Sequence, residues 1–383
     1  MENPKWTPFT QAYDDEGIET ITSKDQIDTE KLIFQKDKNV FKVLRNVHRD
    51  FMIHLISGLP NSFVKLCSEE PWIPYWFLNT MHTLNLNKIS NFKFYQQACV
   101  NYINKRKSHD GGYSSSPSQK GHIVLGYVSM NTIALTMDVN SYNTIDRKSV
   151  YSWIMSLKRP NGSFASETGS EADSRSTYCA IVIASLLNIL TNELTDNVAE
   201  FLISCQGPDG GFAPTPGCET HGGYSFCSIA ALDILGRLKD ININKAIRWC
   251  AERQMPFSGG FNGRPNKLVD TCYTWWCGAM GRILADFAGI DSFWNEEALA
   301  TYVLQVCQCS TPKEGGLFDK PGKRADMYHT MYGLTGLAVA ARNIIKEKTE
   351  FEFPEVDARY GIKAEAVIAM KNHFEQIPFS IEM

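Results

Sequence analysis

A short glycine turn recurs along the chain, in the segments HDGGY, PNGSF, PDGGF, FSGGF and KEGGL. The residues that close these turns lie 51, 48, 49 and 56 residues apart, and they are Tyr113, Phe164, Phe212, Phe261 and Leu317. Such a constant spacing indicates an internal repeat. Each turn follows an apolar helical stretch and precedes a polar loop and a second apolar stretch of helical length. One repeat is therefore a helix, a glycine turn, a loop and a second helix.

The second helices of the repeats predict the fold class. Stretches such as YSFCSIAALDIL and YHTMYGLTGLAVAA are apolar on nearly every face, whereas the first helices carry a charged face. Units that cannot bury a face alone must stack on their neighbours. The repeat pattern therefore predicts an all-α protein in which five or six such hairpins close into a ring. This fold is an α/α barrel of concentric inner and outer helices. An open solenoid is the alternative.

The repeats also predict how the chain is divided. We expect residues 61–345 to form the barrel, residues 1–60 an N-terminal extension, and residues 346–383 a C-terminal tail that packs on the barrel. A chain of 383 residues exceeds the size of one ordinary hydrophobic core. It therefore forms two ordinary domains or one large repetitive domain, and the repeats favour the second.

Composition and charge exclude several classes of protein. With 43% apolar and 21% charged residues, the chain is globular rather than disordered. Its net charge of −4 gives no overall attraction to nucleic acid or to anionic lipid. The longest uncharged run, from Ser176 to Asn192, contains Ser, Thr and Asn residues and predicts a buried helix rather than a membrane span.

The eleven cysteines indicate a reducing compartment. Their number is odd, they form no compact framework, and the first residues, MENPKWTPF, lack the basic and apolar parts of a signal peptide. We therefore expect a cytoplasmic protein whose thiols are mostly free. The pairs Cys307 with Cys309 and Cys272 with Cys277 could suggest metal sites, but their apolar neighbours favour buried free thiols.

Polar and aromatic residues occur near the start of the inner helices at a similar offset. Tyr127, Tyr178, Tyr224, Tyr273 and His329 follow the glycine turns by 12 to 14 residues. Since one repeat maps onto the next by rotation, equivalent residues are expected to meet at one rim of the barrel. This rim is where we expect the chemistry to lie.

Asp270, Cys272 and His329 lie within three residues of an inner-helix start on two neighbouring repeats. Together they offer a carboxylate, a thiolate and an imidazole, which are all zinc ligands. Three protein ligands with one open position are typical of a catalytic zinc site, because a structural site is closed by a fourth ligand. An incidental Asp-x-Cys with a distant His is the alternative.

A basic cluster is expected at the same rim. It contains His221, Arg264, Lys267 and Lys323, beside the hydroxyl of Tyr273. Converging cations in a chain of slightly negative charge imply an anionic ligand, and Arg and Lys suit phosphate oxygens. Ordinary solvated loop charge is the alternative.

Aromatic residues expected to face the interior of the barrel near this rim are numerous enough to form an apolar ligand pocket. Simple core packing is the alternative, and one member of the Trp275–Trp276 pair must point away from the cavity. The aromatic set is Trp72, Trp76, Tyr178, Trp275, Trp276, Tyr328 and Tyr332.

Several segments of the chain are long enough to identify a family, and they are EPWIPYWFL, SLKRPNGSF, EADSRSTYC, CETHGGYSFC, GGFNGRPNKLVDTCY and GGLFDKPGKRADMYHT. They resemble the β subunits of protein prenyltransferases, and in particular the farnesyltransferase branch of that family. The resemblance covers Glu70 to Gly333, whereas the first 60 residues and the tail match poorly. It implies an α/α barrel that forms an obligate heterodimer with a helical-repeat α subunit.

The resemblance implies an activity and its cofactors. A C15 farnesyl group would pass from farnesyl diphosphate to the Cys thiol of a C-terminal CaaX motif, in proteins such as small GTPases. Asp270, Cys272 and His329 would bind one zinc and, with Tyr273, would be the catalytic residues. Asp319, in LFDKPGK, would bind Mg²⁺ near the diphosphate.

The resemblance also implies which residues hold the substrates. Those for the diphosphate are His221, Arg264, Lys267 and Tyr273, to which the α subunit would add a Lys. Those for the isoprenoid are Arg175, Tyr178, Tyr224, Cys227, Trp276, Trp72 and Tyr332. Those for the peptide are Trp72, Trp76, His122, Val124, Leu125, Glu171, Arg175 and Tyr328.

The length of the isoprenoid depends on a few positions of the pocket. Trp72 and Tyr332 are large here but correspond to smaller residues in the C20-transferring relatives, where Asp319 tends to be Lys. These three residues favour C15. The segment RPNKLVDTCY, with Pro265 and Thr271, is more similar to the geranylgeranyl enzymes. A type I geranylgeranyltransferase β subunit is therefore the alternative.

Two other classes share part of the pattern. An α/α-barrel terpene cyclase would share the repeats and the aromatic cavity, but the sequence has no acidic DxDD motif and a cyclase needs no zinc. A non-catalytic barrel that binds a prenyl group or a peptide is disfavoured because the metal-binding and basic residues are all present. Metal analysis would separate such a binder from an enzyme.

Overall fold

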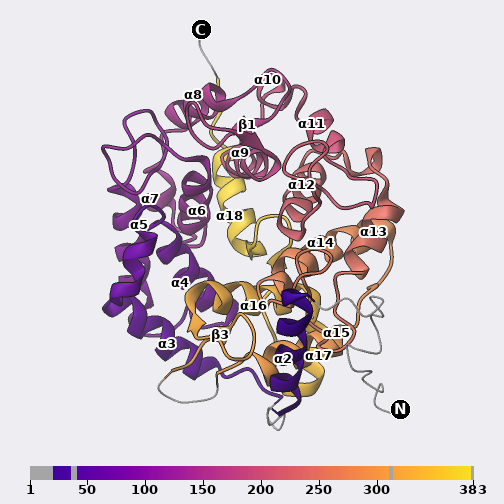
Figure 1. Ribbon diagram of the computed structural model, residues 1–383. Coiled ribbons are helices and arrows are strands. Elements are labelled where there is room, and N and C mark those ends of the chain that lie inside the picture. The colour runs from indigo at the N-terminus through magenta and orange to yellow at the C-terminus, as the bar shows by residue number, and fades with distance from the viewer. Residues whose placement is uncertain (1–19, 36–40, 310–313, 381–383) are drawn as a thin grey trace.

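A computed structural model describes residues 20–35, 41–309 and 314–380 of the chain, and helices arranged in two concentric layers dominate it (Figure 1). The inner helices are α4 (Trp72–Thr83), α6 (Ile123–Ala134), α9 (Ser174–Leu186), α12 (Gly222–Ile234), α14 (Tyr273–Ala288) and α16 (Met327–Ala340). The outer helices are α3 (Arg45–Ser57), α5 (Phe92–Asn104), α8 (Arg147–Leu157), α11 (Val198–Ser204), α13 (Ile243–Ala251) and α15 (Glu296–Thr301). Short elements between them are η1 (Asn61–Leu66), α7 (Val139–Tyr142), α10 (Asn192–Thr195), η2 (Leu238–Asp240) and the π-helical turn η3 (Tyr302–Val306).

The inner helices close into a ring, because each packs on the next and α16 packs on α4. Their apolar character explains this arrangement, since a helix that is apolar all round is stable only when it is buried on all sides. The predicted all-α barrel is confirmed, and the open solenoid is excluded. The uncharged run that begins at Ser176 forms most of buried helix α9. In the described part of the chain, no helix combines the length and the apolar character that a membrane crossing requires.

The glycine turns join the outer layer to the inner one. At every turn of the repeat, a residue that follows the outer helix forms a β-bridge with the residue that closes the turn, as Gln206 does with Phe212. Gly210 in this turn has a φ of 100°, which residues other than glycine rarely adopt. A Cβ at Gly210 would also lie 2.3 Å from the carbonyl oxygen of Lys245 on the next outer helix. The turn therefore needs glycine for its backbone conformation and for its close packing.

Two small hairpins set where inner helices begin. The residue pairs Phe164–Asp173 and Leu317–Asp326 are in register across them. Asp173 and Asp326 then act as the N-caps of α9 and α16, accepting hydrogen bonds from backbone N–H groups of the first helical turn. The hairpins are β1 (Phe164–Ala165) with β2 (Ala172–Asp173), and β3 (Leu317–Phe318) with β4 (Ala325–Asp326).

Residues before the repeats also contribute to the ring. Helix α3 packs on α4, and its buried His48 accepts a hydrogen bond from the backbone N of Gly316 at Nδ1, at 3.1 Å. The other ring nitrogen, Nε2, lies 2.9 Å from Oε1 of Gln308. Helix α2 (Ile21–Gln35) lies outside the layers, where Phe34 contacts Phe257 with ring centroids 4.5 Å apart. The division of the chain at residues 61 and 346 stays a prediction.

The C-terminal segment enters the ring, and helix α18 (Ala364–Glu375) lies near its centre in Figure 1. Side chains of the inner helices bind the backbone of this segment. Asn79 Nδ2 donates to the carbonyl oxygen of Gly361 at 2.7 Å, and the Tyr178 hydroxyl donates to that of Arg359 at 2.7 Å. Before α18 come helix α17 (Arg342–Thr349) and a hairpin of β5 (Val356–Asp357) and β6 (Ile362–Lys363).

Candidate functional site

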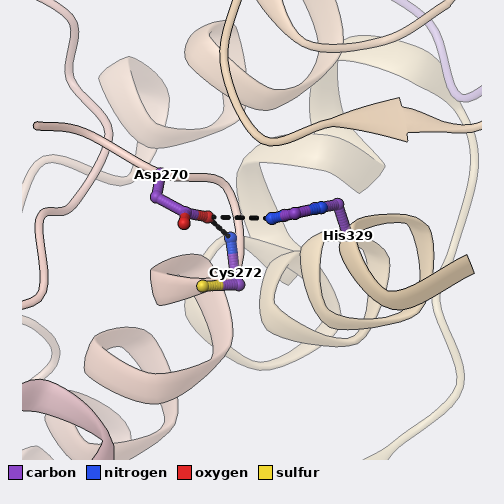
Figure 2. Close-up of side chains that lie close together, drawn as sticks. All are labelled: Asp270, Cys272 and His329. Carbon is purple, nitrogen blue, oxygen red and sulfur yellow. Dashed lines mark hydrogen bonds and ion pairs between the residues drawn. The ribbon is translucent and has the colours of Figure 1, made fainter. Parts of the chain in front are cut away.

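Asp270, Cys272 and His329 come together at the rim (Figure 2). Asp270 and Cys272 end the loop before α14, and His329 lies in the first turn of α16, which packs beside α14. One ligand atom from each residue lies within 4.8 Å of the others, which is close enough for a shared metal ion. Among the described residues, this is the one group of His, Cys, Asp or Glu side chains that meets this criterion.

Hydrogen bonds orient the side chains of Asp270 and His329. The backbone N of Cys272 donates to Oδ1 of Asp270 at 2.8 Å, and His329 Nε2 lies 3.3 Å from the same oxygen (Figure 2). Asp326 accepts from the backbone N of His329 and lies 2.7 Å from its ring nitrogen Nδ1. Because Asp326 engages Nδ1, the imidazole presents Nε2 towards Asp270 and Cys272, as a metal ligand would.

Electrostatics keep the Cys272 thiol and the His329 imidazole protonated at neutral pH. Burial, and then the charge of Asp270, raise the pKa of the Cys272 thiol well above its ordinary value. Although burial opposes the shift, hydrogen bonds with Asp270 and Asp326 raise the pKa of His329 to about 10. Burial likewise opposes ionisation of Asp270, yet the hydrogen bond and charge of His329 lower its pKa. A divalent cation would therefore displace protons from the thiol and the imidazole.

His221 and Tyr273 form a hydrogen-bonded pair beside this group. His221 is the N-cap of α12, and its Nδ1 accepts from the backbone N of Gly223 at 3.1 Å. Burial, and then the charge of Arg264, lower the pKa of His221, which favours the neutral ring. Because Nδ1 accepts a hydrogen bond, the proton of the neutral ring is on Nε2. This N–H donates to the Tyr273 hydroxyl at 3.0 Å. The phenol proton is therefore free to donate to a ligand.

The predicted cations lie on loops that precede the inner helices α14 and α16. Arg264 and Lys267 belong to the loop before α14, and Lys323 belongs to the loop between β3 and β4. Both lysines are exposed, whereas Arg264 is partly buried and forms an ion pair with Glu219. The three predicted cations therefore belong to loops, whereas His221 and Tyr273 are held by hydrogen bonds.

Asp319, the carboxylate that the resemblance implies for magnesium, lies in the loop after β3. Lys320 Nζ lies 2.5 Å from Asp319 Oδ2, so an ammonium group engages the carboxylate. The backbone oxygen of Asp319 accepts from the backbone N of Thr271 at 2.9 Å and from the hydroxyl of Tyr302 at 3.2 Å. Burial, and then the charge of Asp270, raise the pKa of Asp319. Asp319 thus adds negative charge close to the candidate metal site.

An apolar cavity of about 690 Å³ lies inside the ring, with Asp326 and Tyr328 from the start of α16 on its wall. Its volume is in the range of small-molecule sites. Trp276 contributes to it, with its ring 4.7 Å from that of Tyr332, whereas Trp275 is buried against Phe226. The predicted substrate residues that line the cavity are Trp72, Trp76, His122, Val124, Arg175, Tyr178, Cys227, Trp276, Tyr328 and Tyr332.

A second cavity of about 420 Å³ shares Trp72, His122 and Val124 with the first and adds Leu125. Two of the predicted peptide and isoprenoid residues line neither cavity. Glu171 is exposed, and Tyr224 packs beside His221, with the two rings 5.7 Å apart. The structure therefore gathers the predicted peptide and isoprenoid residues apart from these two.

Several residues of the site were not predicted from the sequence. Asp326 could have been found, because an Asp three residues before a functional His at a helix start is an N-cap signal. Phe63, Lys65 and Leu66 come from η1, which precedes the repeats, so no repeat pattern could place them. The cavity residues without a predicted role in substrate binding are Phe63, Lys65, Leu66, Glu69, Tyr127, Cys179, Asp326 and Met327.

Known proteins share this fold and much of this sequence. The family model of the prenyltransferase alpha-alpha toroid domain matches residues 43–374. The protein farnesyltransferase subunit beta of Saccharomyces cerevisiae is 42% identical over 314 residues, which cover 80% of this chain and 72% of that protein. The protein of the same name from Schizosaccharomyces pombe is 37% identical over 305 residues, which cover 77% of each chain.

A solved structure shows the same architecture. The Candida albicans protein geranylgeranyltransferase-I complexed with GGPP superposes with a TM-score of 0.74, covering 87% of this chain and 99% of that chain. Its sequence is 21% identical, so this likeness bears on the fold alone. The family match spans residues 43–374 and so includes the loops that carry the metal group and the His221–Tyr273 pair. The chain therefore belongs to the prenyltransferase α-α toroid family, among the protein farnesyltransferase β subunits.

Proposed function

We propose that this chain is the catalytic β subunit of a protein farnesyltransferase. It transfers a farnesyl group from farnesyl diphosphate to the Cys thiol of a C-terminal CaaX motif. The observation that carries the proposal is that three features share one end of the ring, namely the Asp270–Cys272–His329 group, the His221–Tyr273 pair and the apolar cavity. They suit the three reacting parts, which are the thiol, the diphosphate and the isoprenoid.

The proposed metal is zinc, held by Asp270, Cys272 and His329. One oxygen, one sulfur and one nitrogen are suitable zinc ligands, and three protein ligands leave a coordination position for a substrate. Bound zinc would supply a Lewis acid that keeps a thiol ionised at neutral pH. Asp326 supports this choice, because it holds the His329 ring with Nε2 towards the other two ligands.

The proposed diphosphate residues are His221, Arg264, Lys267 and Tyr273, and together with Lys323 we call them the anion cradle. As the bond between the diphosphate and C1 of the farnesyl group breaks, negative charge accumulates on the leaving group, and preorganised donors stabilise it. Tyr273 can donate its proton there because its oxygen is already hydrogen-bonded to His221. The partner subunit would complete this cradle with a Lys. Aromatic faces of the cavity would stabilise cationic character on the isoprenoid.

Mg²⁺ is proposed as a second cation, with Asp319 as its carboxylate. A hard oxygen ligand beside a diphosphate is suitable for Mg²⁺. In the structure, this carboxylate is paired with Lys320, so magnesium binding requires that ion pair to open. Activity should therefore rise with magnesium concentration over a range in which the zinc content stays constant.

The proposed acceptor is a peptide that lies across both cavities. Trp72, Trp76 and Tyr328 would surround its apolar side chains, with Val124 and Leu125 on the side of the second cavity. His122 and Arg175 would hold its terminal carboxylate through water, since both line the main cavity and offer N–H donors. Glu171 was proposed for the same task, and its exposed position requires a contact through water or a loop movement.

A farnesyl rather than a geranylgeranyl group is proposed because the cavity wall is bulky. Tyr332 is 2% exposed with its ring 4.7 Å from that of Trp276, and the Trp72 ring lies 5.7 Å from that of Trp76. Combining Trp72→Thr with Tyr332→Phe should admit the C20 group. A wild-type protein that prefers geranylgeranyl diphosphate in a competition assay would contradict this proposal and favour the type I geranylgeranyltransferase.

We further infer that the chain acts in the cytoplasm as a heterodimer with a prenyltransferase α subunit. Proteins with a CaaX terminus, such as small GTPases, would be its acceptors. The cradle supports the need for a partner, because its lysines are exposed loop residues that a second subunit could cover. The chain alone should therefore show little transfer activity.

The decisive experiment is co-expression with an α subunit, followed by transfer from labelled farnesyl diphosphate to a CaaX peptide. We expect about one zinc per heterodimer and a labelled thioether that forms only when the peptide cysteine is present. A matched peptide with Ser in place of that cysteine is the control. A folded complex that binds the peptide but contains no zinc and transfers no label would instead indicate a non-catalytic binding barrel.

A further inference from the structure

Arg264 and Glu219 face each other across two rim loops. Arg264 Nη1 donates to Oε2 of Glu219, and the side chains are 36% and 60% exposed. Arg264 belongs to the loop before α14, and Glu219 belongs to the loop that leads into α12. The cation with the best geometry for binding two phosphate oxygens is therefore already occupied by a carboxylate.

The two loops that carry this ion pair are fixed relative to each other. The backbone N of Gly222 donates to the carbonyl oxygen of Gly263 at 2.7 Å. A Cβ at Gly263 would lie 2.1 Å from the Tyr273 hydroxyl, so the backbone here approaches the phenol directly. This backbone contact holds Glu219 and Arg264 on adjoining loops, where their side chains are within reach of each other.

Other cations of the cradle differ in this respect. Among the residues that the structure describes, neither Lys267 nor Lys323 has a side-chain ion pair, and both are exposed. Lys320 is paired with Asp319. An incoming diphosphate can meet the two lysines without a competitor, but it must displace Glu219 to reach the guanidinium of Arg264.

We propose that Glu219 is an exchangeable counter-ion of the anion cradle, which holds Arg264 in place when the cradle is empty and competes with diphosphate for it. This inference rests on the proposed function, because the anion is the diphosphate of the prenyl donor or product. The competition weakens diphosphate binding and thereby favours departure of the product diphosphate after transfer. Glu219 touches neither the metal group nor the cavity, and so it tunes affinity without taking part in the transfer step.

The test measures binding of inorganic diphosphate to the full chain, in its zinc-loaded complex with the α subunit, by calorimetry. Glu219→Gln keeps the shape of the side chain and removes its charge. It should tighten diphosphate binding about two- to fivefold, which is the range of an exposed ion pair. The difference should shrink at high salt, where exposed charges are screened. The KM for farnesyl diphosphate should fall with it.

Two further variants separate competition from other effects. Arg264→Gln should weaken diphosphate binding, and adding Glu219→Gln to it should then produce no tightening, because the competitor has lost its target. Equal tightening in both backgrounds would show a general field effect and would overturn the proposal. Unchanged or weaker binding by Glu219→Gln alone would also overturn it, since Glu219 would then only position Arg264.

The same measurements distinguish this inference from the proposed function. If the folded wild-type complex binds no inorganic diphosphate, the anion cradle itself is wrong, and the role of Glu219 is wrong with it. If the wild type binds diphosphate and transfers farnesyl but Glu219→Gln changes neither affinity nor KM, only the counter-ion role is wrong.

Discussion

The candidate metal site and the anion cradle lie at the same rim, but their side chains are held very differently. Asp270, Cys272 and His329 are largely buried, and hydrogen bonds from Cys272 and to Asp326 orient two of them. The cations of the cradle lie on exposed loops, and Arg264 is held there by a surface carboxylate. Only the His221–Tyr273 pair of the cradle has the fixed character of the metal group.

This difference reflects what each site would bind. A resident metal ion requires ligands at fixed distances, so rigid and buried side chains suit it. An anion that must arrive and depart in every turnover is better served by exposed charges that can exchange partners. We therefore expect changes at the metal group to have large effects and changes at the cradle to have moderate ones.

The largest effect is expected from Cys272→Ala. Because the variant removes a proposed zinc ligand, the metal content should fall from about one per chain to near zero. Transfer activity should fall by more than the roughly 100-fold that loss of an outer-shell partner causes. Metal analysis, circular dichroism and a transfer assay measure these effects. Cys277→Ala, which changes a buried thiol of α14 outside the metal group, is the control. Full zinc content in the Cys272 variant would contradict the assignment.

A smaller effect on the metal group is expected from substitution of Asp326. Asp326→Ala removes the partner of His329 Nδ1 and should lower metal affinity about 10- to 100-fold. Asp326→Asn can still cap α16 through its oxygen, but its amide would face Nδ1 and favour the wrong tautomer. Both variants should therefore lose metal affinity, measured by competition with a chelator. Unchanged affinity in Asp326→Asn would show that Asp326 only caps the helix.

The scaffold behind the metal group can be tested through pH. Burial lowers the pKa of His48 from 6.5 to about 4, although its hydrogen bond to Gln308 opposes the shift. The unfolded chain binds this proton and the folded chain does not, so stability is lost as the pH falls from about 6.5 towards 4, by about 1.4 kcal/mol per pH unit.

Denaturant unfolding of the wild type and of His48→Gln at several pH values measures this contribution. Between pH 6.5 and pH 4, the free energy of unfolding of the variant should depend on pH less steeply than that of the wild type, by about 1.4 kcal/mol per pH unit. His54→Gln, on the exposed side of the same helix, is the matched control and should keep the wild-type slope. An identical slope in the His48 variant would mean that His48 does not stay neutral in the fold.

The smallest effect in this series is expected from Tyr273→Phe. It removes one hydrogen-bond donor, worth about 1 kcal/mol, so affinity for the diphosphate substrate should fall about fivefold. The zinc content should not change, because the phenol is not one of the grouped metal ligands. A loss of zinc on this substitution would show that the two sites are not separable in the way that their contacts indicate.

Features within the repeat could be predicted well. The glycine turns, the buried inner helices and the rim position of Asp270, Cys272 and His329 all follow from spacing, because equivalent residues of a ring meet at one end. The same spacing was less reliable for Tyr127 and Tyr178. They are the fifth residues of their helices, and their hydroxyls face the C-terminal segment.

Contacts from outside the repeat could not be predicted. His48 meets Gln308 across 260 residues, and Asn79 meets Gly361 across 282. Lys65 reaches the main cavity from a short helix that belongs to no repeat. Such contacts depend on how the termini pack against the finished ring, and no local period records that packing.

From the sequence alone follow the repeat, the closed helical ring and the set of side chains that can bind a metal, an anion and an apolar chain. Helical periodicity and residue chemistry suffice for these, because both act locally or by rotation from one repeat to the next. The three-dimensional structure was needed to show that Asp326 orients His329, that Lys320 occupies Asp319, that Glu219 holds Arg264, and that Glu171 faces solvent. These pairings depend on side chains of neighbouring loops competing for the same partners, and that competition is settled only when the loops are packed together.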